Sequence, residues 1–114
     1  SRLTRRAMAY IHTHYAESLT REQIAQWVDI SPDYLTASFR QEMGVTPMAY
    51  LNRYRICQAC DLLKYSDLKI TQIALAVGDW SGANFSRAFQ REMSMSPRSY
   101  RQRSRHGESP RHKD

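Results

Sequence analysis

Apolar residues recur along this chain at three- and four-residue spacing, and that spacing predicts amphipathic helices. The first helix is indicated by Leu3, Ala7, Ile11 and Tyr15, each four residues after the last. No segment alternates convincingly between polar and apolar residues, as a half-buried strand would. The pattern therefore predicts an all-α chain with about seven helices.

The apolar pattern occurs twice. An Ile-Ala pair, a Val, a Phe, a Met, a Ser-Pro or Thr-Pro pair and a Tyr follow in that order over 24–50 and again over 73–100. The copies are 49 residues apart before the turn and 50 residues apart after it, so one residue has been inserted in a turn. A repeat of this period indicates two copies of one supersecondary unit.

Helix start and stop signals divide the first copy into a short helix, a turn and a second helix. Thr20 and Gln23 form a capping box at the start of the short helix. Ser31-Pro32 then starts the second helix, and Gly44 ends it. The residues expected on the buried side of this second helix are Leu35, Phe39 and Met43.

The longest predicted helix joins the two copies. It starts at Thr46-Pro47, runs to about Tyr65 and contains no Gly and no further Pro. A helix of that length spans roughly 25–30 Å. Its expected apolar face consists of Leu51, Ile56, Ala59, Leu62 and Leu63.

The second copy begins near Ile70. The segment Gly78-Asp79-Trp80 predicts its turn, and Ser81 caps the helix that follows. A last short helix is predicted from Ser96-Pro97 through Tyr100. The residues expected on the buried side of the helix after Ser81 are Phe85, Phe89 and Met93.

The length of 114 residues fits one domain, which we place at residues 1–103. A polar segment without apolar period follows over 104–114, and we interpret it as a flexible basic tail. The predicted divisions of the domain are a first helix-turn-helix unit at 20–44, a linker helix at 47–65 and a second helix-turn-helix unit at 70–94.

The net charge of +6 favours an anionic partner such as nucleic acid or anionic lipid. Residues 101–114 hold five Lys and Arg against two acidic residues, so this end contributes +3, half of the total. The folded body is thus only mildly basic. No apolar run approaches the ~18 residues that span a membrane, and no signal-peptide pattern opens the chain. We therefore expect no membrane partner and a cytoplasmic location.

Cys57 and Cys60 form a Cys-x-x-Cys motif, which suggests redox or zinc chemistry. Zinc would need two further ligands, and none stands at ligand spacing. We expect both cysteines to pack within the long helix, three residues apart. The sequence predicts no metal and no cofactor.

A short helix, a turn and a second helix with a one-sided apolar stripe form the helix-turn-helix pattern, whose second helix can enter a DNA major groove. Helical spacing from the buried stripes predicts which residues of that helix face outward. In the first unit they are Asp33, Thr36, Ala37 and Arg40. In the second unit they are Ala83, Ser86, Arg87 and Gln90, with Asn84 at the edge.

Arg87 is the most informative of these positions, because an Arg there can bind guanine O6 and N7 with two hydrogen bonds. Gln90 could pair with adenine or touch phosphate. Asp33 could accept a bond from cytosine N4, or could be a first-turn carboxylate favoured by the helix dipole. Thr36 and Ala37 are small and suit a thymine methyl group.

A second set of residues could bind phosphate. Arg40 is expected to clamp a phosphate and not to read a base. Each of the basic candidates, including Arg87, could instead be a solvated surface charge. The phosphate candidates are Ser31, Arg40, Arg53, Ser81, Arg91 and Arg98.

An enzyme is not indicated, because the sequence offers no paired carboxylates, no nucleophile with a base at a recognisable spacing and no phosphate-binding Gly-rich loop. The alternative to DNA binding is a helical module that binds a partner protein. The sparsely basic first outer face, with Asp33 on it, motivates that alternative.

The span from about residue 3 to residue 101 resembles the DNA-binding domain of AraC/XylS-type bacterial transcription regulators. The second half carries the motifs Ile73-Ala74, Val77-Gly78, Phe85-Ser86-Arg87-Ala88-Phe89, Ser96-Pro97 and Tyr100-Arg101. The first half carries Ile24-Ala25, Ser31-Pro32, Leu35, Phe39, Gly44, Thr46-Pro47, Tyr50-Leu51, Arg55, Ala59 and Leu62-Leu63.

The resemblance implies seven helices, with a recognition helix in each unit at the outward positions named above. It also implies that one monomeric domain docks on two adjacent major grooves of double-stranded DNA and activates transcription through RNA polymerase. Most relatives carry a sensing domain ahead of this one. We therefore expect a C-terminal fragment of a larger regulator, dimeric through its other domain, although small stand-alone members exist.

Three positions depart from the family pattern. Asp29 stands where the family usually has Gly in the first turn, and Ser94 replaces the usual Gly before the final Ser-Pro. Asp79-Trp80 stands where Gly-Phe is usual, so Trp80 is expected to supply the buried aromatic ring one place late. We expect these departures to concern the geometry of the turns and not the fold.

Overall fold

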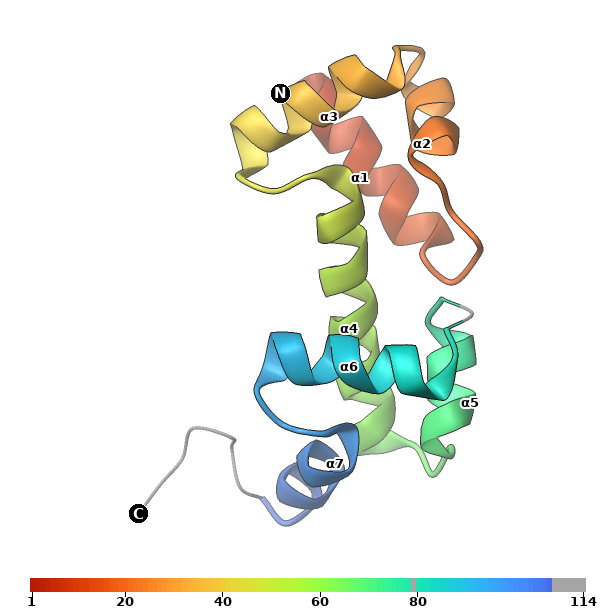
Figure 1. Cartoon of the computed structure of the whole chain (residues 1–114), viewed down its shortest axis with the longest axis vertical. Coiled ribbons are helices and arrows are strands. Elements are labelled where there is room, and N and C mark those ends of the chain that lie inside the picture. Colours follow the sequence, from red (N-terminus) through yellow and green to blue (C-terminus); the bar gives the residue numbers. More distant parts are fainter. Residues whose placement is uncertain (79, 108–114) are drawn as a thin grey trace. The chain divides into compact units, whose positions relative to one another are not determined.

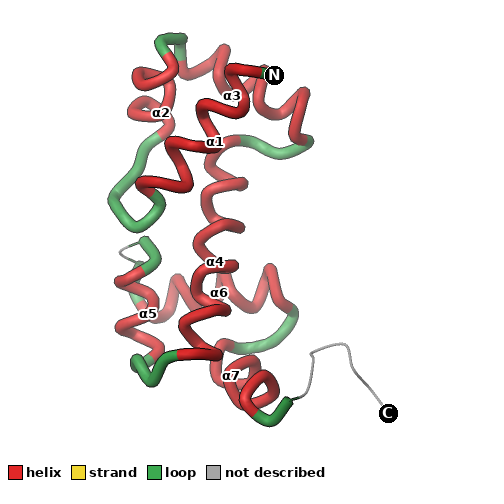
Figure 2. Tube along the Cα trace, turned by 180° about the vertical axis from the view of Figure 1, so that it is seen from behind, coloured by secondary structure: helices red, strands yellow, loops and turns green. Residues whose placement is uncertain are grey.

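The computed structural model describes residues 1–78 and 80–107, so residue 79 and residues 108–114 lie outside the described part. Figures 1 and 2 show helices joined by turns, and the described part contains no strand. This confirms the prediction of an all-α chain with about seven helices. The helices are α1 (Arg2–His14), α2 (Arg21–Val28), α3 (Pro32–Met43), α4 (Pro47–Tyr65), α5 (Ile70–Ala76), α6 (Gly82–Met93) and α7 (Pro97–Arg105).

The chain divides into two compact units, Ser1–Tyr54 and Arg55–Asp114, and the boundary falls within α4. Each unit contains one of the predicted short-helix and second-helix pairs. No helix in the described part of the chain combines the length and apolar character that crossing a bilayer requires.

In the first unit, α1 packs against both α2 and α3, as its apolar stripe predicts. Burying one Phe, Leu or Ile side chain contributes about 1.5–3 kcal/mol, whereas a helix cap contributes about 1 kcal/mol. The core therefore determines how these helices pack, and the caps determine where they begin. The core residues are Ala7, Ile11, Leu19, Ile24, Ala25, Val28, Leu35, Phe39 and Leu51.

In the second unit, α6 packs against α5 and α7. The rings of Phe85 and Phe89 are fully buried, and Tyr100 of α7 meets Phe89 edge-on with the ring centres 5.8 Å apart. The buried apolar residues of this unit are Ile56, Ala59, Cys60, Leu63, Ile73, Ala74, Val77, Phe85, Ala88 and Phe89.

The predicted capping box at α2 is confirmed. The backbone N–H of Gln23 donates to Thr20 Oγ1 at 3.1 Å, and the N–H of Thr20 donates to Gln23 Oε1 at 2.8 Å. At the equivalent start of α5, the N–H of Lys69 donates to Gln72 Oε1 at 2.8 Å. A Lys side chain has no acceptor atom, so Lys69 supplies only half of such a box.

Three sequence predictions about packing and ends are wrong. Met43, predicted on the buried side of α3, is 37% exposed because it is the last residue of the helix and extends past the core. Cys57, predicted to pack within α4, is exposed, and only Cys60 is buried. Burial raises the pKa of the Cys60 thiol to about 11, so this thiol stays protonated at neutral pH.

The third wrong prediction is the end of the last helix, since α7 continues past Tyr100 to Arg105. Two arginines stabilise the extra turn of α7 by donating hydrogen bonds to backbone carbonyl groups at the end of α4. Arg101 donates to the carbonyl oxygens of Leu63 at 2.9 Å and Ser66 at 3.1 Å, and Arg105 also donates to Ser66. The sequence pattern did not predict the longer helix, because these contacts join residues more than thirty positions apart.

Candidate nucleic-acid interface

The turn of the first unit contains the first departure from the family pattern. Asp29 ends α2 with φ 63°, in the left-handed region where Gly is the usual residue. Its Asp side chain tolerates that region better than most, because short polar side chains bond locally to the backbone. Ser94, the second departure, has φ 60° at the end of α6. Both residues thus adopt the left-handed backbone conformation that Gly would adopt at these positions.

The inserted residue of the second unit lies inside a turn whose closing hydrogen bond is kept. In the first turn, the N–H of Ile30 donates to the carbonyl of Ala25 at 3.1 Å. In the second turn, the equivalent N–H of Trp80 donates to the equivalent carbonyl of Ala74 at 3.2 Å. The two bonded residues are five positions apart in the first unit and six positions apart in the second. The inserted residue therefore lies between the two bonded residues of the second turn.

The second turn depends on a close approach at Gly78. A Cβ added to Gly78 would lie 2.5 Å from Nε of Arg55, which is only 6% exposed. The guanidinium of Arg55 lies 5.8 Å from the centre of the Trp80 ring, and burial lowers the pKa of Arg55. Trp80 itself is half-buried and contacts Phe85, so it supplies the predicted aromatic ring in part. The other predicted turn residue, Asp79, lies outside the described part.

The first predicted recognition helix, α3, is positioned by its cap and its buried side. Ser31 Oγ accepts the N–H of Tyr34 at 3.2 Å, which starts the helix, and Leu35 and Phe39 are fully buried. The predicted outward residues lie on the opposite side. Those that are exposed are Asp33, Ala37 and Arg40, and Thr36 is half-buried.

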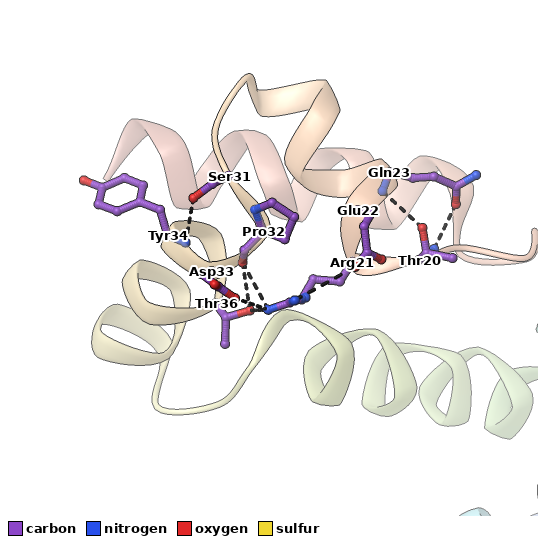
Figure 3. Close-up of polar contacts among 9 residues, drawn as sticks. All are labelled: Thr20, Arg21, Glu22, Gln23, Ser31, Pro32, Asp33, Tyr34 and Thr36. Atoms are coloured by element: carbon purple, nitrogen blue, oxygen red, sulfur yellow. Dashed lines mark hydrogen bonds and ion pairs between the residues drawn. The ribbon is translucent and has the colours of Figure 1, made fainter.

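A cation from the preceding helix lies against this outer face. Nη1 of Arg21, the first residue of α2, lies 3.2 Å from Asp33 Oδ1, 3.0 Å from Thr36 Oγ1 and 3.4 Å from the Pro32 carbonyl oxygen (Figure 3). Its Nη2 lies 3.9 Å from a Glu22 oxygen. Asp33 is therefore paired with a guanidinium, an arrangement that neither sequence-based alternative for Asp33 anticipated.

The hydroxyl group of Thr36 has its one proton engaged within the protein. It donates to the Pro32 carbonyl at 3.1 Å and accepts from Arg21. A hydroxyl has only one proton to donate. The part of Thr36 without a polar partner is its methyl group, which is the part that suits a thymine methyl.

Sequence reasoning missed Arg21. Periodicity assigned the outer face only to residues of α3, whereas Arg21 is 12 and 15 residues earlier than its side-chain partners. One weak signal existed: a long basic side chain at the first position of one helix, followed by an acidic residue in the first turn of the next.

The second predicted recognition helix, α6, starts in the same way, since Ser81 Oγ accepts the N–H of Asn84 at 3.2 Å. Its opposite side is buried through Phe85 and Phe89. Of the predicted outward residues, Ser86 is half-buried. The others, Ala83, Asn84, Arg87 and Gln90, are exposed.

An open depression of about 420 Å³ on α6 is lined by Ser86, Arg87, Gln90 and Arg91. It brings together three base-reading candidates and one phosphate candidate. Arg87 donates through Nη2 to Asn84 Oδ1, one turn earlier on the helix. A guanidinium has five N–H donors, so this bond holds Arg87 in place and leaves donors for a ligand.

The remaining phosphate candidates are also at the surface, with Arg40, Arg53, Arg91 and Arg98 all exposed. Ser31 and Ser81 are N-caps whose hydroxyl protons can still be donated. The phosphate and base roles of all these residues remain predictions.

The chain is similar to known transcription regulators. Residues 24–103 match a protein-family model described as a helix-turn-helix domain. A curated relative, the HTH-type transcriptional activator RhaS of Salmonella arizonae, is 39% identical over 95 residues, which cover 83% of this chain. The match covers 34% of RhaS, so the chain spans about a third of the length of this relative.

Several solved structures resemble the fold. The C-terminal domain of AraT, a response regulator from Geobacillus stearothermophilus, has a TM-score of 0.86 and 38% identity, covering 90% of this chain and 85% of that one. The DNA-binding domain of the global transcriptional factor AdpA, in complex with a target DNA, also has a TM-score of 0.86. Its identity is 27%, covering 96% of this chain and 97% of that one.

Proposed function

The chain belongs to the AraC-type helix-turn-helix family, and from that premise we propose that it is the sequence-specific DNA-binding domain of a bacterial transcription regulator. The observation that carries the proposal is the outer face of α6, where Ser86, Arg87, Gln90 and Arg91 border one open depression. Two arginines and a Gln on the exposed side of a helix whose other side is buried suit the edge of a major groove.

In the second unit, Arg87 reads guanine through a two-bond contact with O6 and N7. Its bond to Asn84 orders the guanidinium before DNA arrives, which reduces the conformational entropy lost on binding. Gln90, one turn further along, pairs with adenine or contacts phosphate. Arg91 and Arg98 supply charge to the DNA backbone.

In the first unit, the methyl groups of Thr36 and Ala37 contact thymine methyl groups. Asp33 accepts a hydrogen bond from a base amino group, and Arg40 and Arg53 bind phosphates. In both units, the N-terminus of the recognition helix faces a phosphate, with the hydroxyl of Ser31 or Ser81 as an added donor.

The two units read two successive major grooves of one double-stranded site, whose half-sites are about 34 Å apart along the DNA. Because the outer residues of α3 and α6 differ, a single domain reads an asymmetric site as a monomer. The regulator acts in the cytoplasm and activates transcription through contact with RNA polymerase. The name of its relative RhaS, a transcriptional activator, supports activation as the direction of control. The full protein dimerises through a further domain.

In vitro selection of bound DNA, followed by affinity measurements at 50 and 200 mM salt, tests this function. We expect two conserved half-sites one DNA turn apart and an affinity that falls steeply with salt, because each neutralised phosphate releases counterions. If no sequence is enriched and weak binding is insensitive to salt, the domain binds a partner protein and the proposal is wrong.

The same selection tests a finer expectation, that the second unit reads more sequence than the first. It follows from the greater number of hydrogen-bonding side chains on α6 that are not engaged by another helix. Strong base preference confined to the half-site of the first unit would contradict it.

A further inference from the structure

We propose that Arg21 determines the specificity of the first unit as a positioning residue, by holding Asp33 and Thr36 and by offsetting the charge of Asp33. This inference rests on the proposed DNA binding and adds a residue that lies outside the recognition helix. Three contacts from one guanidinium nitrogen carry it, to Asp33, Thr36 and the Pro32 carbonyl (Figure 3).

The first step of the argument concerns charge. The Asp33 side chain is 96% exposed on a face that must approach phosphates, and a carboxylate there is repelled by them. The guanidinium of Arg21 lies 3.2 Å away and offsets that repulsion. With the pair intact, the charge of Asp33 is offset, and the carboxylate remains available as an acceptor for a base amino group.

The second step concerns geometry. Arg21 is 35% exposed, so it is held more firmly than the carboxylate that it contacts. Because its nitrogen bonds to Thr36 and to the Pro32 carbonyl as well, it fixes the first turn of α3 from outside that helix. Thr36 is thereby oriented with its hydroxyl group toward the protein.

The third step is a comparison with the second unit, where the counterpart of Arg21 is Ile70 and the counterpart of Asp33 is Ala83. Both the cation and the anion are missing there together, which indicates that the pair functions as a unit. In the second unit the guanidinium at the recognition face comes from Arg87, which is held by Asn84. Each unit therefore has a guanidinium in contact with a side chain of its recognition helix, from α2 in the first unit and from α6 in the second.

A double-mutant cycle tests the proposal, with Arg21→Ala, Asp33→Ala and the double variant assayed on the selected DNA and on random DNA. Arg21→Ala leaves Asp33 unpaired near phosphate and Thr36 unheld, and we expect about tenfold weaker binding to the selected DNA and a smaller loss on random DNA. Removing Asp33 as well should recover part of that loss. The resulting coupling should be at least about twofold, the lower end for residues that share one network.

Base preference provides the readout that a merely structural role would not change. In repeated selections, Arg21→Ala and Asp33→Ala should lose preference at the same base position of the first half-site, with the second half-site unchanged. Arg5→Ala, at an exposed position of α1, is the matched control for loss of one positive charge and should leave the base preferences intact. An ion pair this exposed contributes little to stability, so thermal unfolding of the variants should be nearly unchanged.

Additive losses with no recovery in the double variant would make Arg21 a direct phosphate contact and overturn the positioning role. An unchanged selection profile for Arg21→Ala would also overturn it. If the wild-type chain itself enriches no sequence, the proposed function fails instead, so the two failures are distinguishable.

Discussion

The first unit brings Arg21 from α2 to its outer face, whereas the second unit carries Arg87 on α6 itself. The buried sides of the two units are nearly the same, with an Ile-Ala pair in the short helix and a Phe at the centre of the second helix, all buried in both copies. The turns also differ, since Asp29 has a positive φ and its counterpart Gly78 is needed for close packing. Duplication thus preserved the core and left the surface and the turns free to diverge.

The largest expected effect separates the reading roles of the two units. Arg87→Ala should cost about 1–3 kcal/mol on the selected site and relax preference at one base of the second half-site. Competition binding with single-base variants of that half-site measures it. Equal weakening on selected and random DNA would make Arg87 a phosphate contact, and Arg91→Ala is the matched comparison within the same depression.

The equivalent turn positions are constrained for different reasons, Gly78 by packing and Asp29 by its backbone conformation, and Gly78 gives the larger response to substitution. Gly78→Ala forces a Cβ to within 2.5 Å of the buried Arg55 side chain, so we expect a destabilisation of about 1–3 kcal/mol by urea unfolding. Gly82→Ala is the control and should cost less, because its nearest side-chain atom, Thr71 Cγ2, lies 3.3 Å from the added carbon. Equal stability of Gly78→Ala and wild type would contradict the packing role.

The half-formed capping box of the second unit should be repairable. Lys69→Thr supplies the side-chain acceptor that Thr20 provides in the first unit, and we expect a gain of about 1 kcal/mol in the free energy of unfolding. Lys69→Ala controls for removal of the charge and should give no such gain. A Thr20→Ala variant that loses nothing would show that the box contributes little in either unit.

The smallest effect concerns the left-handed residues. Asp29→Gly should stabilise the chain by about 0.5 kcal/mol. The relief of backbone strain at φ 63° outweighs the larger conformational entropy that Gly gives to the unfolded chain. Ser94→Gly should act similarly at φ 60°. Asp29→Ala should instead destabilise, because Ala neither favours that region nor bonds locally. Thermal unfolding measures all three, and a loss on Asp29→Gly would mean that the carboxylate itself stabilises the turn.

The sequence by itself determined the helices, their starts and most of the buried side of each unit. Those features depend on residues within one helical turn of each other, such as Ser31 with Tyr34 or Phe85 with Phe89, and local spacing records them directly. The inserted residue could also be located in the turn from the repeat alone, and the hydrogen bond from Trp80 to Ala74 agrees with that placement.

Only the tertiary structure decided which side chains from other helices complete each face and each turn. Arg21 reaches Asp33 because α2 packs against α3, and Arg55 occupies the space that Gly78 leaves open. Arg101 extends α7 because the end of α4 lies within reach. Helical periodicity specifies the direction of a side chain about its own axis, but contact between helices depends on how their cores pack, and that is a property of the whole unit.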